Sequence, residues 1–338
     1  MAKVYIGNQY YGTQIYYLSE ALRFIGIDAE SVAFGEDPYS RPVHRLITTK
    51  GRYKRLRIKY KMIKEYDVFI FVYGQSLFPL NLDLFLLRVF RKKVFFHYLG
   101  YDIQLVRRSR TIYKWTNVNY YKNNRNHLLD DLYKIFRLQW QRIFSHSTFV
   151  CNPSLLDFSP SSEVLPLTID TMEYVSTAKV YGDGKKVLNI YHAPTSLGNK
   201  GTVYIEEALE QLKLKGYKFN YVRLENVSVD NFKTVLKECD LYIDQLLIGW
   251  YGMASVQSMA LGVPTVCFYR EHFDFNCYGG TSDIPIINAN PETIQSVLES
   301  VLNNKFDLAN ISAQSISFVK TYHSLDVLGE RLKTLVNI

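Results

Sequence analysis

The apolar and polar positions form two kinds of segment that alternate along most of the chain. Short, almost uninterrupted apolar runs such as Asp67–Tyr73 and Lys93–Tyr98 are typical of strands buried on both faces of a parallel sheet. Longer segments with apolar residues every three or four positions, such as His127–Phe144, are typical of helices. The alternation predicts an α/β fold with doubly wound parallel sheets.

The first half of the chain predicts one such unit. Its expected strands are Lys3–Ile6, Ser31–Phe34, Asp67–Tyr73, Lys93–Tyr98 and Ser147–Cys151, and its expected helices are Gln14–Phe24, Gly51–Lys64, Leu82–Phe90 and His127–Phe144. The stretch Leu165–Gly184 then loses periodicity and carries proline, glycine, serine and threonine, so we place the domain linker there.

The alternation starts again after the linker. The expected strands are Lys186–His192, Phe219–Leu224, Asp240–Gln245 and Pro264–Tyr269, and the expected helices are Val203–Lys215, Val229–Cys239, Gly252–Leu261, Pro291–Leu302, Gln314–Thr321 and Leu325–Val336. We therefore expect Rossmann-like domains at residues 1–170 and 178–320, with a ligand cleft between them, and a closing helix in 321–338 that crosses back to the first domain.

Length and composition agree with two globular domains. The chain has 338 residues, of which 47% are hydrophobic, and no apolar run is long enough to span a membrane. The start, MAKVYIGNQYYG, lacks the pattern of a signal peptide, and the four cysteines have no metal-ligand spacing. We expect buried thiols, no metal and a cytoplasmic location.

Charge is unevenly distributed. Residues 1–177 hold 25 Lys/Arg against 15 Asp/Glu, whereas the rest holds 15 against 17. Eight of these cations lie in Lys50–Lys64, interleaved with an apolar stripe; the candidates for contact with an anionic membrane are Arg52, Lys54, Arg55, Arg57, Lys59 and Lys61. Alternatively, the stripe packs on the sheet and the cations are a solvated face. We do not expect nucleic-acid binding, because no groove-reading motif accompanies the charge.

The segment Asp240–Val266 carries the strongest candidate site. It predicts a strand, a loop with Gly249 and Gly252, a helix and a further strand. Glycines let a backbone approach a ligand closely, and the free N–H groups of a helix N-terminus suit a diphosphate. Gln257 would reach a neighbouring group such as a ribose. The alternative is a tight turn that binds no ligand.

This segment resembles the C-terminal domain of family-4 glycosyltransferases, particularly bacterial capsule, O-antigen and exopolysaccharide enzymes. The run YHAPTSLGNKGT at Tyr191–Thr202 is similar to their donor-phosphate loop, and further pieces such as KVYIGNQYYG and FVKTYHSLDVLGERL extend the resemblance over nearly the whole chain. It implies the GT-B architecture of two Rossmann-like domains and a nucleoside-diphosphate sugar as substrate, without cofactor or metal. The donor-binding residues that it implies are Gly12, Lys200, Gly201, Glu225, Gln245, Gly249, Trp250, Tyr251, Gly252 and Gln257.

The resemblance also implies roles for residues at strand ends. Gly100 and Tyr101 would line the acceptor side, and the catalytic candidates are His97, Asp102 and Asp244. Asp244 and Gln245 end a strand, and we expect them to bind donor hydroxyls or, alternatively, to orient the glycine loop. A core histidine that is simply hydrogen-bonded is the alternative for His97, because it lies within an apolar strand.

The chain departs from the family at two places. Many members have two glutamates eight positions apart, where this sequence has Gly249 and Gln257. The arginine that often precedes the phosphate-loop lysine is also missing, with Leu197 near its place. Transfer with retention needs leaving-group stabilisation and a water-poor site more than a strong base.

Three hypotheses follow. The first is a cytoplasmic glycosyltransferase, peripheral at the inner face of the cell membrane, that moves a sugar onto a glycan or lipid-linked acceptor. The second is a non-catalytic GT-B scaffold that binds a partner glycosyltransferase or a glycan. The third, which the motifs fit least well, is a sugar-nucleotide 2-epimerase.

Overall fold

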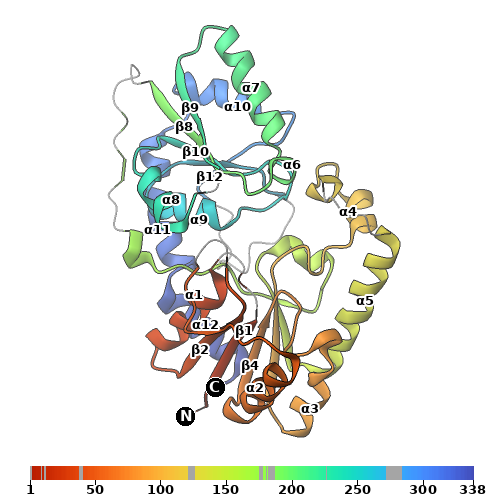
Figure 1. The fold of residues 1–338 in the computed structure, drawn as a ribbon. Helices are drawn as coiled ribbons and strands as arrows, with labels where there is room; N and C mark the ends of the chain where they lie inside the picture. The colour runs from red at the N-terminus through yellow and green to blue at the C-terminus, as the bar shows by residue number, and fades with distance from the viewer. Residues whose placement is uncertain are drawn as a thin grey trace. The chain divides into compact units, whose positions relative to one another are not determined.

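The structure is a computed structural model that describes the chain except residues 1, 9, 11–12, 38–40, 121–125, 175–177, 180, 182–186, 226 and 272–283. The chain divides into two compact units (Figure 1). Unit 1 comprises residues 1–105, 125–170 and 323–338, and unit 2 comprises residues 106–124 and 171–322. The segment 106–124, which lies within the range expected for the first domain, thus clusters with unit 2.

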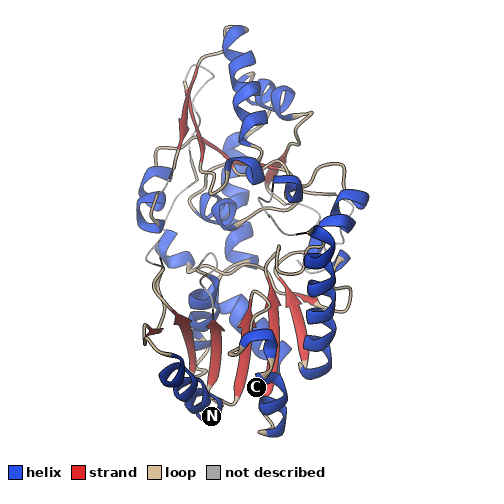
Figure 2. Cartoon of the chain, turned by 45° about the vertical axis from the view of Figure 1, so that its right-hand side comes forward, coloured by secondary structure: helices blue, strands red, loops and turns tan. Residues whose placement is uncertain are grey.

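Unit 1 is built on a sheet whose described pairings are all parallel, in the order β3-β2-β1-β4-β5-β6-β7 (Figure 2). Its strands are β1 (Val4–Asn8), β2 (Ala29–Phe34), β3 (Arg45–Ile47), β4 (Val68–Val72), β5 (Lys93–Tyr98), β6 (Ser147–Val150) and β7 (Glu163–Val164). Every residue of β4 is buried, as the apolar run predicts for a strand covered on both faces.

Helices cover both faces of this sheet. They are α1 (Gln14–Phe24), α2 (Arg52–Glu65), α3 (Asp83–Val89), α5 (His127–Phe144) and α12 (Leu325–Val336), with short 3-10 turns η1 (Pro79–Asn81) and η3 (Pro153–Asp157). The β1-to-β2 connection runs along the sheet in the opposite direction to those containing α2, α3 and α5. Right-handed crossovers therefore place these three helices on one face and α1 on the other.

The end of the chain is part of unit 1. Helix α12 packs along α1, and Gly329 lies so close to the Ala21 carbonyl that a Cβ at this position would overlap its oxygen. Arg331 of α12 also donates to the Val164 carbonyl at 2.6 Å. Residues 323–338 are thereby held by packing against an element from the start of the chain.

Unit 2 repeats the plan with a smaller parallel sheet in the order β12-β11-β10-β8-β9. Its strands are β8 (Leu188–His192), β9 (Phe219–Arg223), β10 (Leu241–Ile243), β11 (Thr265–Cys267) and β12 (Ile286–Asn288). Its helices are α4 (Val106–Ile112), α6 (Leu197–Lys200), α7 (Thr202–Leu214), α8 (Val229–Leu236), α9 (Met253–Ala260), α10 (Ile294–Leu302) and α11 (Leu308–Tyr322), with turns η2 (Asn117–Tyr120) and η4 (Thr171–Tyr174).

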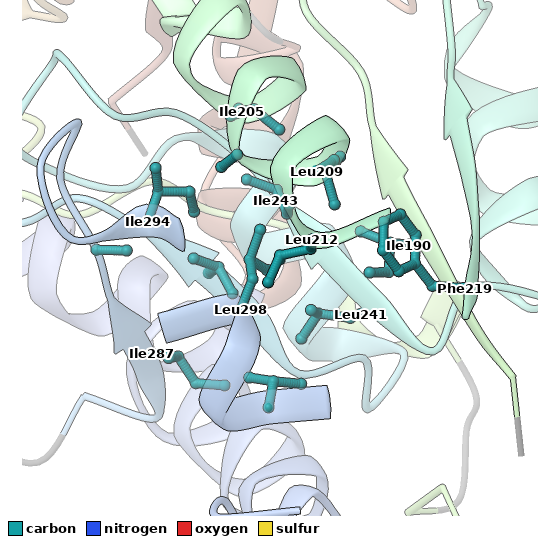
Figure 3. Close-up of a cluster of buried hydrophobic side chains, with 14 of the residues drawn as sticks. Ile190, Ile205, Leu209, Leu212, Phe219, Leu241, Ile243, Ile287, Ile294 and Leu298 are labelled. Atoms are coloured by element: carbon teal, nitrogen blue, oxygen red, sulfur yellow. The ribbon is translucent and has the colours of Figure 1, made fainter. Parts of the chain in front are cut away.

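The core of unit 2 lies between the sheet and helices α7 and α10 (Figure 3). Ile190, Leu241 and Ile243 from the strands point toward Leu212 of α7 and Leu298 of α10. These side chains come from apolar positions at strand and helix periods, so the hydrophobic pattern alone specifies which faces meet.

The sequence missed several short elements. Strands β3 and β12 have three residues each, and α4 lies in a stretch for which no helix was expected. Helix α11 begins six residues before the expected start at Gln314. A three-residue edge strand has too few positions to show an alternation, so only its pairing with a neighbour defines it.

Three histidines are buried among backbone carbonyls. His97 in β5 pairs with the Leu165 carbonyl at 3.1 Å, His192 in β8 with the Ile243 carbonyl at 2.8 Å, and His323 with the Leu167 carbonyl at 2.6 Å. Burial lowers the pKa of each imidazole to about 4. The three rings are therefore neutral at pH 7, and each donates its ring N–H to the carbonyl.

We expect stability to fall as the pH is lowered from about 6.5 to about 4. The folded pKa of each histidine lies below its ordinary value, so the unfolded chain takes up protons that the folded chain excludes, at about 1.4 kcal/mol per pH unit per site. Burial raises the pKa of Asp102 to about 6, so its protonation stabilises the folded chain over part of the same pH range. This single group opposes the effect of three histidines. Urea unfolding at pH 7.5 and 4.5 measures the difference; an unchanged midpoint would contradict the neutral histidines.

Candidate functional site

The phosphate-loop candidate follows β8 at the carboxyl end of the unit 2 sheet. The chain passes through the short helix α6, turns at Gly201 with φ +74°, and enters α7. A Cβ on Gly201 would lie 3.3 Å from Leu246 and Leu247, so the left-handed turn also fits closely against the next loop. The Leu246 amide donates to the Lys200 carbonyl at 3.0 Å, which joins the two loops.

Lys200 and Asp244 form a buried ion pair. Lys200 Nζ lies 2.5 Å from Asp244 Oδ1, with 13% of the lysine side chain and none of the aspartate side chain exposed. Burial alone would raise the pKa of Asp244, but the Lys200 charge and hydrogen bonds from Lys200, Ser255 and the Gly252 amide hold it below its ordinary value. Asp244 is therefore an ionised counter-ion of the lysine, which still has two of its three N–H donors for a ligand.

The same carboxylate connects Lys200 to the start of α9. Asp244 Oδ2 accepts from the Gly252 amide at 3.0 Å and from Ser255 Oγ at 2.6 Å. A Cβ on Gly252 would be in ordinary contact, 3.4 Å from Asp244 Oδ2 and 3.8 Å from Lys200 Nζ. The missing side chain at Gly252 thus leaves space directly beside the lysine ammonium at a helix N-terminus, an arrangement that suits an anion.

Gln245 organises the loop between β10 and α9. Its Oε1 accepts from the Leu247 and Ile248 amides at 2.9 and 2.6 Å, and its Nε2 donates to the Trp250 and Phe268 carbonyls at 2.6 and 3.0 Å. The side chain is fully buried. These contacts show that Gln245 orients the glycine loop, one of the two roles expected for this strand end, and its role in donor binding stays a prediction.

Arg270 fills the space beside Gly249. This glycine has φ +83°, and a Cβ there would overlap the Arg270 guanidinium. The guanidinium donates to the Ile248 carbonyl at 2.9 Å and the Trp115 carbonyl at 2.8 Å, and it lies 3.5 Å from the centre of the Tyr113 ring. Gly249, where the family has its first glutamate, is therefore adjacent to the buried Arg270. The hydrogen bonds of this guanidinium connect Trp115 to the glycine loop.

The remaining donor-side candidates are mostly enclosed. Trp250 and Tyr251 are buried and stack with ring centres 5.2 Å apart. The buried Gln257 donates from Nε2 to the Tyr174 hydroxyl at 2.8 Å, within unit 2. Glu225, in contrast, is exposed after β9 and pairs with Arg223 at 2.7 Å. Gly12 lies outside the described residues.

The candidates in unit 1 lie at and after the end of β5. His97 is completely buried and its Nδ1 has no hydrogen-bond partner among the described residues, so the structure favours the core histidine over a ligand contact. Asp102 is also buried, and its carboxylate accepts from the amides of Leu99 and Gly100 at 3.2 and 2.8 Å. It shapes the turn that contains Gly100 and Tyr101.

The basic helix α2 is more exposed than a packed apolar stripe would be. Tyr53, Leu56 and Tyr60 are 78%, 51% and 46% exposed, and only Met62 and Ile63 of the helix are buried. The interpretation that the whole stripe packs on the sheet is wrong, because only the last turn of the helix reaches the core. The exposed cations of this surface are Arg52, Lys54, Arg55, Arg57 and Lys61, and Lys59 is partly buried.

Several site residues were not singled out from the sequence. Ser255 is the third residue of α9, and no local signal marks it, because the N-cap is Gly252 and the Ser255 hydroxyl donates to Asp244. His192 spans from the Ile243 carbonyl to Thr202 Oγ1 at 2.8 Å, and Tyr120 packs so closely on Gly198 that a Cβ there would approach its ring to 2.8 Å. These two contacts and that of Arg270 join segments far apart in the sequence.

No group of three or more His, Cys, Asp or Glu side chains among the described residues is placed to hold a metal ion. None of the described helices combines the length and hydrophobicity that crossing a membrane would require. Cys151, Cys239 and Cys267 are buried free thiols; Cys277 lies outside the described residues.

Comparison with known proteins identifies the fold. No protein-family model and no curated protein sequence matches the chain. Solved structures are similar to it over its whole length, among them the following three. HepE from Anabaena, in complex with UDP-glucose, is 12% identical with a TM-score of 0.63, and each chain is covered completely. The sucrose-phosphate synthase of Thermosynechococcus elongatus is 11% identical with a TM-score of 0.60, covering 100% of this chain and 98% of its own.

The third structure is an alpha-glucosyltransferase in complex with UDP and a 13-mer DNA. It is 12% identical with a TM-score of 0.63, and both chains are covered completely. The likeness confirms the predicted fold class: two parallel-sheet α/β units of the GT-B architecture.

Proposed function

We propose that the chain is a glycosyltransferase that moves a sugar from a nucleoside-diphosphate sugar to a glycan acceptor. One observation carries the proposal: on a GT-B fold, the Lys200 ammonium lies next to Gly252, which has no side chain, at the N-terminus of α9. A lysine and free helix N–H groups at one point match the charge of a diphosphate. HepE, which shares the fold, is solved with UDP-glucose.

The finer proposal follows the family-4 resemblance. The diphosphate leaves with its negative charge stabilised by Lys200 and the amides at the start of α9, without a metal, and the sugar is transferred with retention. The acceptor is a lipid-linked glycan in surface polysaccharide synthesis. The exposed cations of α2 support a location at the inner face of an anionic membrane.

A nucleotide screen tests the donor site. We expect at least one of UDP, GDP and ADP at millimolar concentration to raise the melting temperature, because a ligand that binds only the folded state stabilises it. Turnover of the matching nucleotide sugar then tests transfer. If none of the three changes the melting temperature, the donor site is wrong.

The variant Gly252→Ala tests whether the nucleotide binds at this position in unit 2. Its methyl group has room in the protein and its φ of −105° suits alanine, so we expect an almost unchanged melting temperature without ligand. The same methyl group lies 3.8 Å from Lys200 Nζ, where a phosphate oxygen would bind, so we expect at least about tenfold weaker nucleotide binding. Titration calorimetry measures this; equal affinity would place the nucleotide elsewhere.

The surroundings of Gly249 favour a second candidate, a non-catalytic GT-B scaffold that binds a partner glycosyltransferase or a glycan. The family's first glutamate is absent there and Arg270 occupies the adjacent space. Nucleotide binding without donor hydrolysis or transfer would favour the scaffold over the enzyme.

A further inference from the structure

Helix α5 of unit 1 is amphipathic, but its polar side faces the protein interior and its apolar side faces solvent. Its buried residues are Asp131, Lys134, Leu138 and Gln141, of which three are polar. The outward side carries Leu129, Leu132 and Phe136, which are 63%, 51% and 65% exposed. Apolar side chains that recur every three or four residues along a helix normally face a hydrophobic core. A stripe of them on the solvent side therefore indicates a surface that binds an apolar partner.

The polar inner side of α5 is well satisfied, so the helix is held in this orientation. Lys134 Nζ donates to the Gln104 carbonyl at 3.0 Å, pairs with Asp130 at 2.9 Å, and lies 3.5 Å from the centre of the Tyr101 ring. Gln141 accepts from the Tyr98 hydroxyl and donates to the Gly74 carbonyl, both at 2.8 Å. Rotating the helix so that the apolar stripe faces inward would break these buried hydrogen bonds, and each unpaired buried polar group would lower the stability of the fold.

The exposed apolar surface continues onto the neighbouring helix. Arg88 of α3 donates to the Ile143 carbonyl at the end of α5 at 3.0 Å, and Trp140 of α5 donates to the Asn81 carbonyl at 3.2 Å. We define the α3–α5 face by six large apolar side chains that are more than half exposed, on the two helices and at the N-cap of α3: Leu82, Phe85, Val89, Leu129, Leu132 and Phe136. Both helices lie on the sheet face that also carries α2.

The side chains next to the α3–α5 face include several cations. A pocket of about 420 Å³ opens between α2, residues 74–81 and α5, and it is lined by Lys59 and Arg137 among others. Lys59 Nζ lies 5.1 Å from the Phe34 ring centre and 5.4 Å from that of Phe78. The exposed cations of α2 continue this charge. An apolar surface bordered by cations, with a basic pocket large enough for a phosphate, matches the interface of an anionic phospholipid bilayer.

We infer that the α3–α5 face inserts into the interface of an anionic membrane, with the cations of α2 and the pocket against the phosphate headgroups. This inference rests on the proposed membrane location, to which it adds a defined insertion surface, and it does not depend on sugar transfer. A second copy of the chain is a poorer occupant, because a two-fold contact would bring two strongly cationic surfaces together.

Vesicle sedimentation of the full chain tests the inference. We expect binding to phosphatidylcholine vesicles that contain phosphatidylglycerol, weakened by salt, and little binding to phosphatidylcholine alone. The double variant Leu129→Gln, Phe136→Gln removes two insertion residues and keeps a helix-compatible side chain. We expect its affinity for the vesicles to be at least about tenfold lower, since both substitutions remove apolar surface that is buried on insertion.

Phe24→Gln is the matched control. Phe24 is 65% exposed, as Phe136 is, but it ends α1 on the opposite face of the sheet, so this variant should bind like the wild type. Circular dichroism melting checks that all variants are folded, and nucleotide shifts on the same samples report separately on the donor site. The inference is overturned if the double variant is folded and binds normally, if no vesicle binds, or if the wild type is a dimer that the double variant converts to a monomer without vesicle binding.

Discussion

Lys200→Ala will lower the free energy of unfolding and abolish stabilisation by nucleotide. The substitution leaves the Asp244 carboxylate fully buried without its 2.5 Å partner. Removing one member of a buried ion pair costs about 3–5 kcal/mol, because the remaining charge stays desolvated. The same substitution removes the cation that we assign to the donor diphosphate. Urea unfolding with and without the best nucleotide measures both effects.

Two further variants separate these effects. Lys215→Ala breaks an ion pair in unit 2 of similar length, 2.8 Å to Glu299, but with side chains 47% and 31% exposed, so we expect a loss of at most about 1 kcal/mol and normal nucleotide binding. The double variant Lys200→Ala, Asp244→Asn removes the buried charge and should recover part of the lost stability without nucleotide binding. If Lys200→Ala still responds to nucleotide, Lys200 is a structural lysine.

Gly249→Ala will also be strongly destabilising. The residue must keep φ +83°, and its Cβ would overlap a guanidinium held by the Ile248 and Trp115 carbonyls and by Tyr113. Displacing Arg270 breaks two partly buried hydrogen bonds from its charged guanidinium, at about 1.5–3 kcal/mol each, in addition to about 1–2 kcal/mol of backbone strain. Urea unfolding again gives the number.

The control variant Gly216→Ala separates the cost of displacing Arg270 from that of backbone strain. Gly216 has φ +91° after α7, and a Cβ there would meet no atom within 4 Å, so Gly216→Ala carries the backbone strain without the overlap. We expect Gly249→Ala to be the more destabilising variant by about 3 kcal/mol or more. Equal losses would show that Arg270 moves away freely and that a larger residue, including the family's glutamate, fits this position.

Much of the candidate site was predicted from local pattern. The segment from Asp240 to Val266 has a strand, a glycine turn and a helix at almost the expected positions, and Lys200, at the end of α6, contacts it. The contacts of Gln245 and Asp102 could not be predicted from position alone. Residues at strand ends are placed where ligands bind, but both side chains are used by nearby backbone amides. Strand-end position does not distinguish these two uses, whereas burial and hydrogen-bond partners do.

By itself, the sequence determined the alternation of strands and helices, the parallel sheets and the basic character of the first half, because each follows from local periodicity or composition. Only the tertiary structure decided the Lys200–Asp244 pair and the Arg270 clamp beside Gly249, since both join segments separated by tens of residues. It also decided the reversed orientation of α5. The apolar stripe of that helix is plain in the sequence, but the buried partners of Lys134 and Gln141 turn it outward.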